Sequence, residues 1–163
     1  MTTFNELGLN EQLLSAIQEM GFETPTEIQP KAIPIFLNRA SDLVALAQTG
    51  TGKTAAFGLP ILHHLDVNDK STQALIISPT RELCMQITND LKNYSKHMRG
   101  VKIVAVYGGS SIMGQIKDIR NGVHIIVATP GRLIDLLDRK AMKIDQIQTV
   151  VLDEADEMLN MGF

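Results

Sequence analysis

The sequence predicts an α/β fold in which a parallel β-sheet carries helices on both faces. Short runs rich in Val, Ile and Leu alternate with longer helix-like stretches along most of the 163 residues. These apolar runs are almost continuous, which is typical of strands that are buried on both faces. A glycine-rich loop also follows the first run and leads into a helix-like stretch, which is the context of a phosphate-binding loop.

The expected elements follow one another in a regular order. Two helices, at 10–20 and 27–37, precede the first strand, and Gly21 marks the end of the first of them. The expected strands are 43–46, 74–77, 102–106, 124–127 and 149–152. The expected helices between them are 53–65, 81–98, 111–120 and 131–139. We divide the chain into a helical segment, 1–38, and a sheet-containing domain, 39–163.

Composition narrows the class of protein. A hydrophobic content of 44% and a charged content of 20% are those of an ordinary globular domain. The apolar runs are too short to span a membrane, and the first ten residues lack the features of a secretion signal, so we expect a cytoplasmic protein. Cys84 is the only cysteine, which excludes an internal disulfide, and we expect it to pack in a helix. The net charge of −3 argues against one large basic patch for nucleic acid.

The loop at 47–54 is suited to hold a nucleoside triphosphate. Gly50 and Gly52 permit backbone conformations in which successive N–H groups turn toward phosphate oxygens, and the following helix N-terminus adds partial positive charge. Lys53 is placed to reach the β and γ phosphates, and the Thr54 hydroxyl suits a Mg²⁺ ligand. Ala47 stands where the general pattern has glycine. The predicted ATP-binding residues here are Gln48, Thr49, Gly50, Thr51, Gly52, Lys53, Thr54 and Ala55.

Two carboxylates follow the last expected strand. Asp153 is suited to hold Mg²⁺ through water, and Glu154 is suited to orient or deprotonate the attacking water in phosphoryl transfer. Taken alone, these residues would equally suit a helix N-terminus, where the dipole favours carboxylates. The phosphate loop upstream favours the catalytic interpretation, with Lys53, Asp153 and Glu154 as the catalytic residues.

The tetrapeptide 153–156, Asp-Glu-Ala-Asp, together with the loop at 47–54 resembles the DEAD-box family of ATP-dependent RNA helicases. The segment 21–29, with the isolated Phe4 before it, resembles the Q motif of that family. The resemblance implies a RecA-like P-loop domain that uses ATP and Mg²⁺, with Thr54 and Asp153 at the metal. It also implies that Phe4, Thr24 and Gln29 contact the adenine. An amide such as Gln29 can donate to N7 and accept from the N6 amino group, which would select ATP over GTP.

Three further segments resemble the RNA-contacting motifs of the family, and each comes where an expected strand ends. Helix starts and glycines at such places offer backbone N–H groups and close approach to a sugar–phosphate backbone. We therefore expect RNA contacts that read backbone shape, with weak sequence preference. The expected RNA-binding residues are Pro79, Thr80, Arg81, Gly108, Gly109, Thr129, Pro130, Gly131 and Arg132.

The family core has two RecA-like domains, and this sequence carries the motifs of the first only. The Ser-Ala-Thr strand that in the family lies between strands 43–46 and 149–152 is not in the sequence, nor is the second domain with its arginine finger. We expect a displaced strand 149–152, a segment of another chain in the gap, or further residues after 163. Two alternatives stay open: a DNA translocase or helicase, which the Asp-Glu-Ala-Asp and Gln29 segments disfavour, and a nucleotide-binding interaction module that does not hydrolyse ATP.

Overall fold

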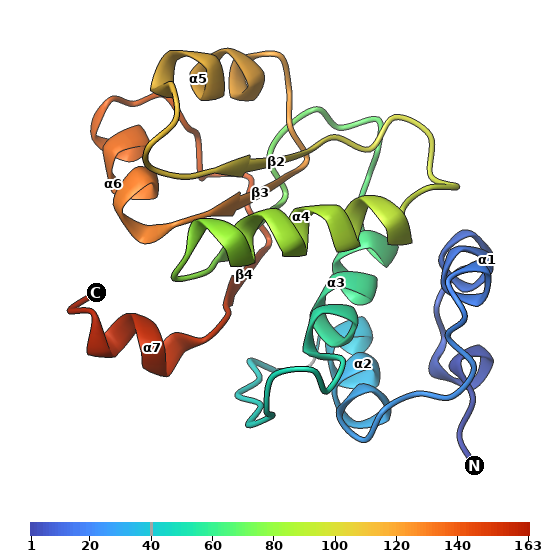
Figure 1. Cartoon of the computed structure of the whole chain (residues 1–163). Coiled ribbons are helices and arrows are strands. Elements are labelled where there is room, and N and C mark those ends of the chain that lie inside the picture. Colours follow the sequence, from blue (N-terminus) through green and yellow to red (C-terminus); the bar gives the residue numbers. More distant parts are fainter. Residues whose placement is uncertain (40) are drawn as a thin grey trace. The chain divides into compact units, whose positions relative to one another are not determined.

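The computed structural model describes residues 1–39 and 41–163 and divides into two compact units (Figure 1). The first unit comprises Met1–Leu65 and Asp90–Arg99, and the second comprises Asp66–Asn89 and Gly100–Phe163. The phosphate loop therefore belongs to the first unit, and the acidic tetrapeptide belongs to the second. Among the described residues, no helix is both long and apolar enough to cross a bilayer.

The regular secondary structure in the described part of the first unit is all helical. Asn10 caps its second helix by accepting a hydrogen bond from the Leu13 N–H at 3.0 Å. Gly58 lets two helices approach closely, because a Cβ added there would stand 2.7 Å from Cδ2 of Leu91. Its elements are the 3₁₀ helix η1 (Phe4–Leu7), α1 (Glu11–Glu19), α2 (Ile28–Asn38), α3 (Lys53–His63) and the end of α4 (Arg81–Tyr94).

The second unit holds a parallel sheet of four strands in the order β2-β3-β1-β4. The strands are β1 (Ala74–Ile77), β2 (Ile103–Val106), β3 (Ile125–Ala128) and β4 (Thr149–Leu152). All four positions of β3 are buried, as expected of a strand with both faces covered. The helices of this unit are the first part of α4, α5 (Ile112–Arg120), α6 (Pro130–Asp138) and α7 (Ala155–Asn160). The predicted parallel α/β fold is confirmed.

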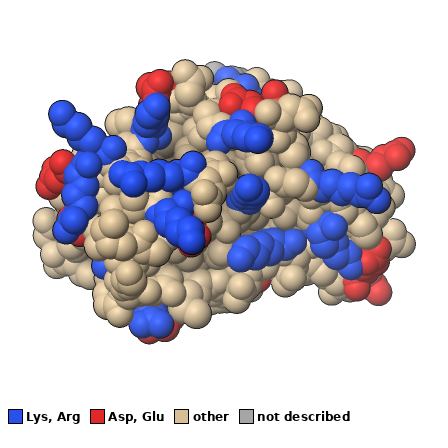
Figure 2. All heavy atoms as spheres, turned by 90° about the horizontal axis from the view of Figure 1, so that it is seen from above, with Lys and Arg blue, Asp and Glu red and all other residues tan. Residues whose placement is uncertain are grey.

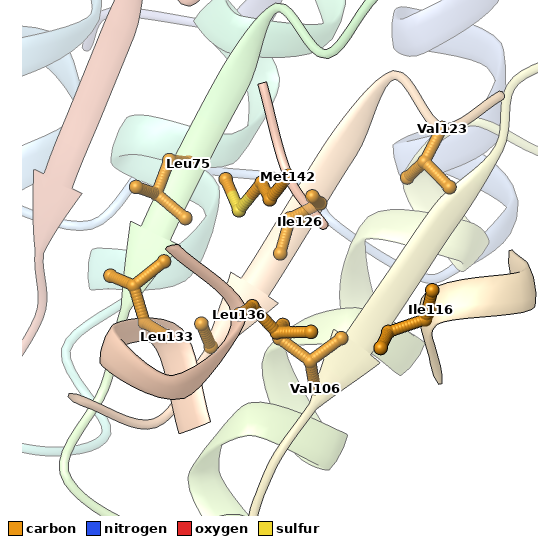
Figure 3. Packing of buried hydrophobic residues seen from close by; sticks show 9 residues of the cluster. Leu75, Val106, Ile116, Val123, Ile126, Leu133, Leu136 and Met142 are labelled. Carbon is orange, nitrogen blue, oxygen red and sulfur yellow. The ribbon is translucent and has the colours of Figure 1, made fainter. Parts of the chain in front are cut away.

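One face of the sheet packs against α5 and α6, as Figure 3 shows. Val106 and Ile126 on the strands are fully buried, and Leu136 of α6 is fully buried beside them. Ile116 brings the apolar face of α5 to the same cluster. Each such side chain contributes about 1.5–3 kcal/mol by leaving water. This packing fixes where the strands end, and therefore where the loops after them begin.

The predicted strand 43–46 is wrong. These residues form no regular secondary structure, and Val44 and Leu46 are 89% and 95% exposed. A strand needs a neighbour to pair its backbone N–H and C=O groups, and the described part of the unit to which this segment belongs contains no strand. In contrast, β4 is not displaced: it pairs with β1 in register, Ala74 opposite Thr149 and Ile77 opposite Leu152.

The structure also defines the environments of the paired histidines, of two methionines near the end of the chain and of the cysteine. His63 and His64 are both half-buried, and each ring makes a hydrogen bond within the first unit. Met158 of α7 is buried, whereas Met161, which follows that helix, is 50% exposed. Cys84 packs in α4 as expected, and burial, with a smaller contribution from Asp153, raises the pKa of its thiol to about 12.

Candidate functional site

The phosphate loop has the backbone that its glycines predict. Gly50 and Gly52 both have a φ of +80°, in the left-handed region that residues with a Cβ rarely adopt. The helix α3 begins at Lys53, and among the described residues no side chain caps its start. The first N–H groups of α3 are therefore suited to an anion such as a phosphate.

The segment 21–29 is hydrogen-bonded to the backbone of this loop. The Thr26 hydroxyl donates to the Thr51 carbonyl at 2.7 Å. The Gln29 Nε2 donates to the Gly52 carbonyl at 3.2 Å, and its Oε1 accepts from the Thr26 N–H at 2.9 Å. A Cβ on Gly52 would stand 2.4 Å from Gln29 Nε2 and 2.8 Å from Thr26 Oγ1. Glycine at 52 is thus required by contact as well as by backbone conformation.

The expected adenine-binding residues differ in exposure. Gln29 is only 2% exposed, and its amide already bonds Thr26 and the loop, which leaves one N–H and one lone pair of Oε1 for another partner. Phe4 is 5% exposed, and its ring centroid lies 6.0 Å from that of Phe22. The Phe22 centroid lies in turn 6.1 Å from that of Tyr94. Thr24 is exposed. A role for Phe4 in stacking on adenine therefore stays a prediction.

In the second unit, four motif segments leave the sheet at the same edge. The registers place the ends of β1, β2, β3 and β4 level with one another: Ile77 opposite Ala128 and Leu152, and Val106 opposite Ala128. The ladder continues one step further, where the Thr129 N–H donates to the Val106 carbonyl and the Asp153 N–H donates to the Ile77 carbonyl. The carboxyl edge of a parallel sheet is where such folds bind ligands.

Most of the candidate RNA-binding residues at this edge are glycines or lie at helix starts, where backbone groups would make the contacts. A Cβ added at Gly108, Gly109 or Gly131 would meet no atom of the described residues within 4 Å. Thr80 caps α4 by accepting from the Leu83 N–H at 3.2 Å. Thr129 makes no such bond at the start of α6, where Pro130 takes the first position; Pro130 and Pro79 are both buried. The open glycines would let a sugar–phosphate backbone come close.

The two arginines of these segments are held by protein groups. The Arg81 guanidinium lies over the Tyr107 ring, 4.8 Å from its centroid, which is a cation–π contact. Arg132 donates from Nη1 to Gln115 Oε1 at 2.6 Å and from Nη2 to the Ser110 carbonyl at 3.1 Å. Both guanidinium groups are thereby fixed beside the loop that follows β2.

The acidic tetrapeptide begins directly after β4. Glu154 has a φ of +54°, a left-handed conformation that costs a residue with a Cβ about 1–2 kcal/mol. It forms the turn between the strand and α7, and Asp153 and Glu154 are both half-buried. Strain of this kind concentrates at functional positions.

The distribution of surface charge favours nucleic-acid binding through individual groups over binding to one large basic patch. On the face drawn in Figure 2, individual Lys and Arg side chains are spread among neutral residues, and most Asp and Glu lie near the rim of the view. With a net charge of −3, the chain has no overall positive field to attract a polyanion. Nucleic-acid binding would therefore depend on helix starts, open glycines and individual arginines.

Comparison with known families decides the class of this chain. A family profile described as DEAD/DEAH box helicase matches residues 26–163, which is most of the chain. The chain belongs to the DEAD/DEAH box helicase family. The matched range contains the phosphate loop, the three segments at the sheet edge and the acidic tetrapeptide.

Individual relatives agree with the family match. The chain is 52% identical to an ATP-dependent RNA helicase CshA of Listeria monocytogenes, over all of this chain and 31% of that protein. It is 49% identical to the DEAD-box ATP-dependent RNA helicase CshA of Geobacillus kaustophilus, over all of this chain and 34% of that protein. It thus spans about a third of the length of these curated relatives.

A solved structure confirms the fold. The crystal structure of a DEAD box protein from the hyperthermophile Methanococcus jannaschii matches with a TM-score of 0.94 at 43% identity. The match covers 99% of this chain and 44% of that one. The predicted RecA-like type of fold is therefore confirmed.

Some residues at the site were not predicted from the sequence. Thr26 lies in the segment that resembles the Q motif but was not among the predicted binding residues, yet its hydroxyl donates a hydrogen bond to the phosphate loop. Gln115 and Tyr107 were not singled out, although they hold Arg132 and Arg81. One signal was present: Gln115 is a polar residue on the apolar face of a predicted helix, beside Ile116, and buried amides are usually hydrogen-bonded.

Proposed function

We propose that this chain is the N-terminal ATP-binding part of an ATP-dependent RNA helicase. The observation that carries the proposal is the contact of Gln29 and Thr26 with the backbone of the phosphate loop. This contact joins the segment suited to recognise adenine with the segment suited to hold phosphates. The family and the names of the relatives support the same function.

In this proposal, the N–H groups from Gly50 to Thr54 receive the phosphates, and Lys53 neutralises the β and γ groups. Thr54 and Asp153 are the proposed ligands of Mg²⁺, which when bound would neutralise the charge of the phosphates. These assignments rest on ligand chemistry, since a hydroxyl and a carboxylate are the oxygen donors that Mg²⁺ prefers. Glu154 orients and deprotonates the attacking water.

RNA is the proposed partner at the carboxyl edge of the sheet in the second unit. The open glycines and the start of α6 would approach the sugar–phosphate backbone, and Arg81 and Arg132 would supply positive charge. A second RecA-like domain is the proposed source of the opposing arginine. Because such an arginine contributes a factor of about 10³–10⁵ in phosphoryl transfer, we expect feeble hydrolysis and no unwinding by residues 1–163 alone. A cytoplasmic location also stays part of the proposal.

The test combines nucleotide binding and turnover. Calorimetry of ATP binding should show that Lys53→Ala loses most of the affinity, whereas Lys31→Ala, which removes an exposed lysine of α2, retains it. ATP turnover is then measured with and without single-stranded RNA, on residues 1–163 and on a chain of the relatives' full length. RNA should stimulate only the longer chain. Full turnover by residues 1–163 alone would contradict the need for a second domain, and binding without turnover in both would favour an interaction module.

A further inference from the structure

One continuous set of contacts links the three RNA-contacting segments of the second unit. At its centre, Gln115 accepts a hydrogen bond from Arg132 Nη1 at 2.6 Å and donates from Nε2 to the Tyr107 carbonyl at 3.2 Å. The second guanidinium nitrogen, Arg132 Nη2, donates to the Ser110 carbonyl at 3.1 Å. The start of α6 and the loop after β2 are therefore held together by one amide and one guanidinium.

Tyr107 extends this set of contacts to the segment after β1. Its ring lies beneath the Arg81 guanidinium, while its carbonyl accepts from Gln115. The same residue thus positions one arginine through its ring and is itself positioned through its backbone. Gly108 and Gly109 follow it directly and are exposed. Moving the Tyr107 backbone would consequently move Arg81 and both glycines.

Gln115 is placed where an apolar residue would normally lie. It is 7% exposed and sits on the inner face of α5 beside Ile116, which packs in the core. A buried amide costs free energy unless its polar atoms are hydrogen-bonded, and here both the oxygen and the nitrogen are. An amide at this position makes two directed bonds that no apolar side chain of the same size could make.

We infer that Gln115 is a positioning residue for RNA binding: it fixes the Arg132 guanidinium and the loop 107–110 relative to each other, so that both arginines and the glycine backbone face one sugar–phosphate chain. This inference rests on the proposed RNA-binding function. Gln115 itself stays buried and acts through Arg132 and Tyr107. Its loss should weaken RNA binding while leaving the ATP loop, which lies in the other unit, unaffected.

The main variant is Gln115→Met, which keeps the length of the side chain and removes both hydrogen bonds. We expect affinity for a fluorescein-labelled single-stranded oligouridylate, measured by anisotropy at low salt, to fall about tenfold. ATP affinity should stay within about twofold of the wild-type value. Ile116→Val is the matched control, because it loosens the packing of the same helix without touching the contacts of Gln115. It should bind RNA as the wild type does.

A double-mutant cycle separates positioning from general stability. In an Arg132→Met background, Gln115→Met should weaken RNA binding by less than about threefold, because residues that act through one contact are not additive. Additive losses, an unchanged affinity in Gln115→Met, or an equal loss in Ile116→Val would each overturn the inference.

Amide hydrogen exchange of residues 107–110 gives a readout that does not depend on RNA. It should be faster in Gln115→Met than in the wild type and in Ile116→Val. If the wild type binds no RNA, the proposed function fails on that ground. The exchange rates then decide this inference by themselves: unchanged exchange in Gln115→Met refutes the bracing of the loop, and faster exchange supports it.

Discussion

The Gln29 amide lies directly against Gly52, with its Nε2 3.2 Å from the Gly52 carbonyl oxygen to which it donates. A Cβ on Gly52 would stand 2.4 Å from the same nitrogen. The segment proposed to recognise adenine therefore contacts the loop proposed to bind phosphates at the backbone of Gly52. A side chain added at position 52 would have to displace Gln29.

Gly52→Ala should reduce ATP affinity much more than Gly50→Ala. Both glycines have a φ of +80°, so both variants carry the same cost of a Cβ in the left-handed region, about 1–2 kcal/mol. Only the Cβ at 52 collides with Gln29 and Thr26; the one at 50 meets no described atom within 4 Å. Calorimetry with ATP checks this. Equal losses in the two variants would show that the collision has no effect on the loop.

Gln29→Glu should weaken ATP binding by roughly one to two decades, because a correct donor–acceptor pair is worth about 1–3 kcal/mol. The carboxylate keeps the acceptor for the Thr26 N–H but loses the donor to the Gly52 carbonyl. We therefore expect inorganic tripolyphosphate, which has no base, to weaken as well, though less than ATP. Competition calorimetry measures both. If GTP competes as well as ATP for the wild type, the adenine assignment is wrong.

The free energy of unfolding should fall as the pH is lowered below the ordinary pKa of a histidine, because of His63. Burial, and secondly the neighbouring His64, lower the pKa of His63 below its ordinary value of 6.5, and its Nδ1 accepts from the Asn10 N–H at 3.1 Å. The folded state thus favours the neutral ring. This contribution is complete above about pH 6.5 and is lost below it, because the unfolded chain then binds the extra proton.

Urea unfolding at a series of pH values tests the His63 assignment. His63→Gln, which has no charge to gain, should show a smaller loss of unfolding free energy between pH 7.5 and pH 5.5 than the wild type. Identical pH profiles for the two proteins would assign the dependence to other groups.

Glu154→Gly should be more stable than Glu154→Ala by about 1 kcal/mol, because only the alanine keeps a Cβ at a φ of +54°. Both variants lose the same carboxylate, so the difference between them measures the cost of a Cβ at this backbone conformation. Neither should support ATP turnover in a chain of the relatives' length, since the proposed base is gone. Unfolding free energies in urea provide the comparison. A more stable alanine variant would mean that the turn at 154 is not strained.

Local patterns predicted most of the secondary structure correctly. Four of the five expected strands form. All four positions of β3 are buried, whereas Val150 and Leu152 of β4 are 56% and 58% exposed, so burial on both faces is not what the four strands share. The exception is the segment 43–46, which has the same apolar pattern but no partner strand in the described part of its unit. Apolar sequence favours a strand, but pairing decides whether one exists.

The sequence by itself determined the family, the order of the motifs and the residue types that suit ATP, Mg²⁺ and RNA. Those features depend on local chemistry, such as glycines that permit a φ of +80° or a strand that ends in carboxylates. Only the tertiary structure decided that Gln29 holds Gly52 and that Gln115 links Arg132 to Tyr107. The residues in these pairs are 8 to 23 positions apart along the chain, and their contacts follow from packing in three dimensions, which no local pattern encodes.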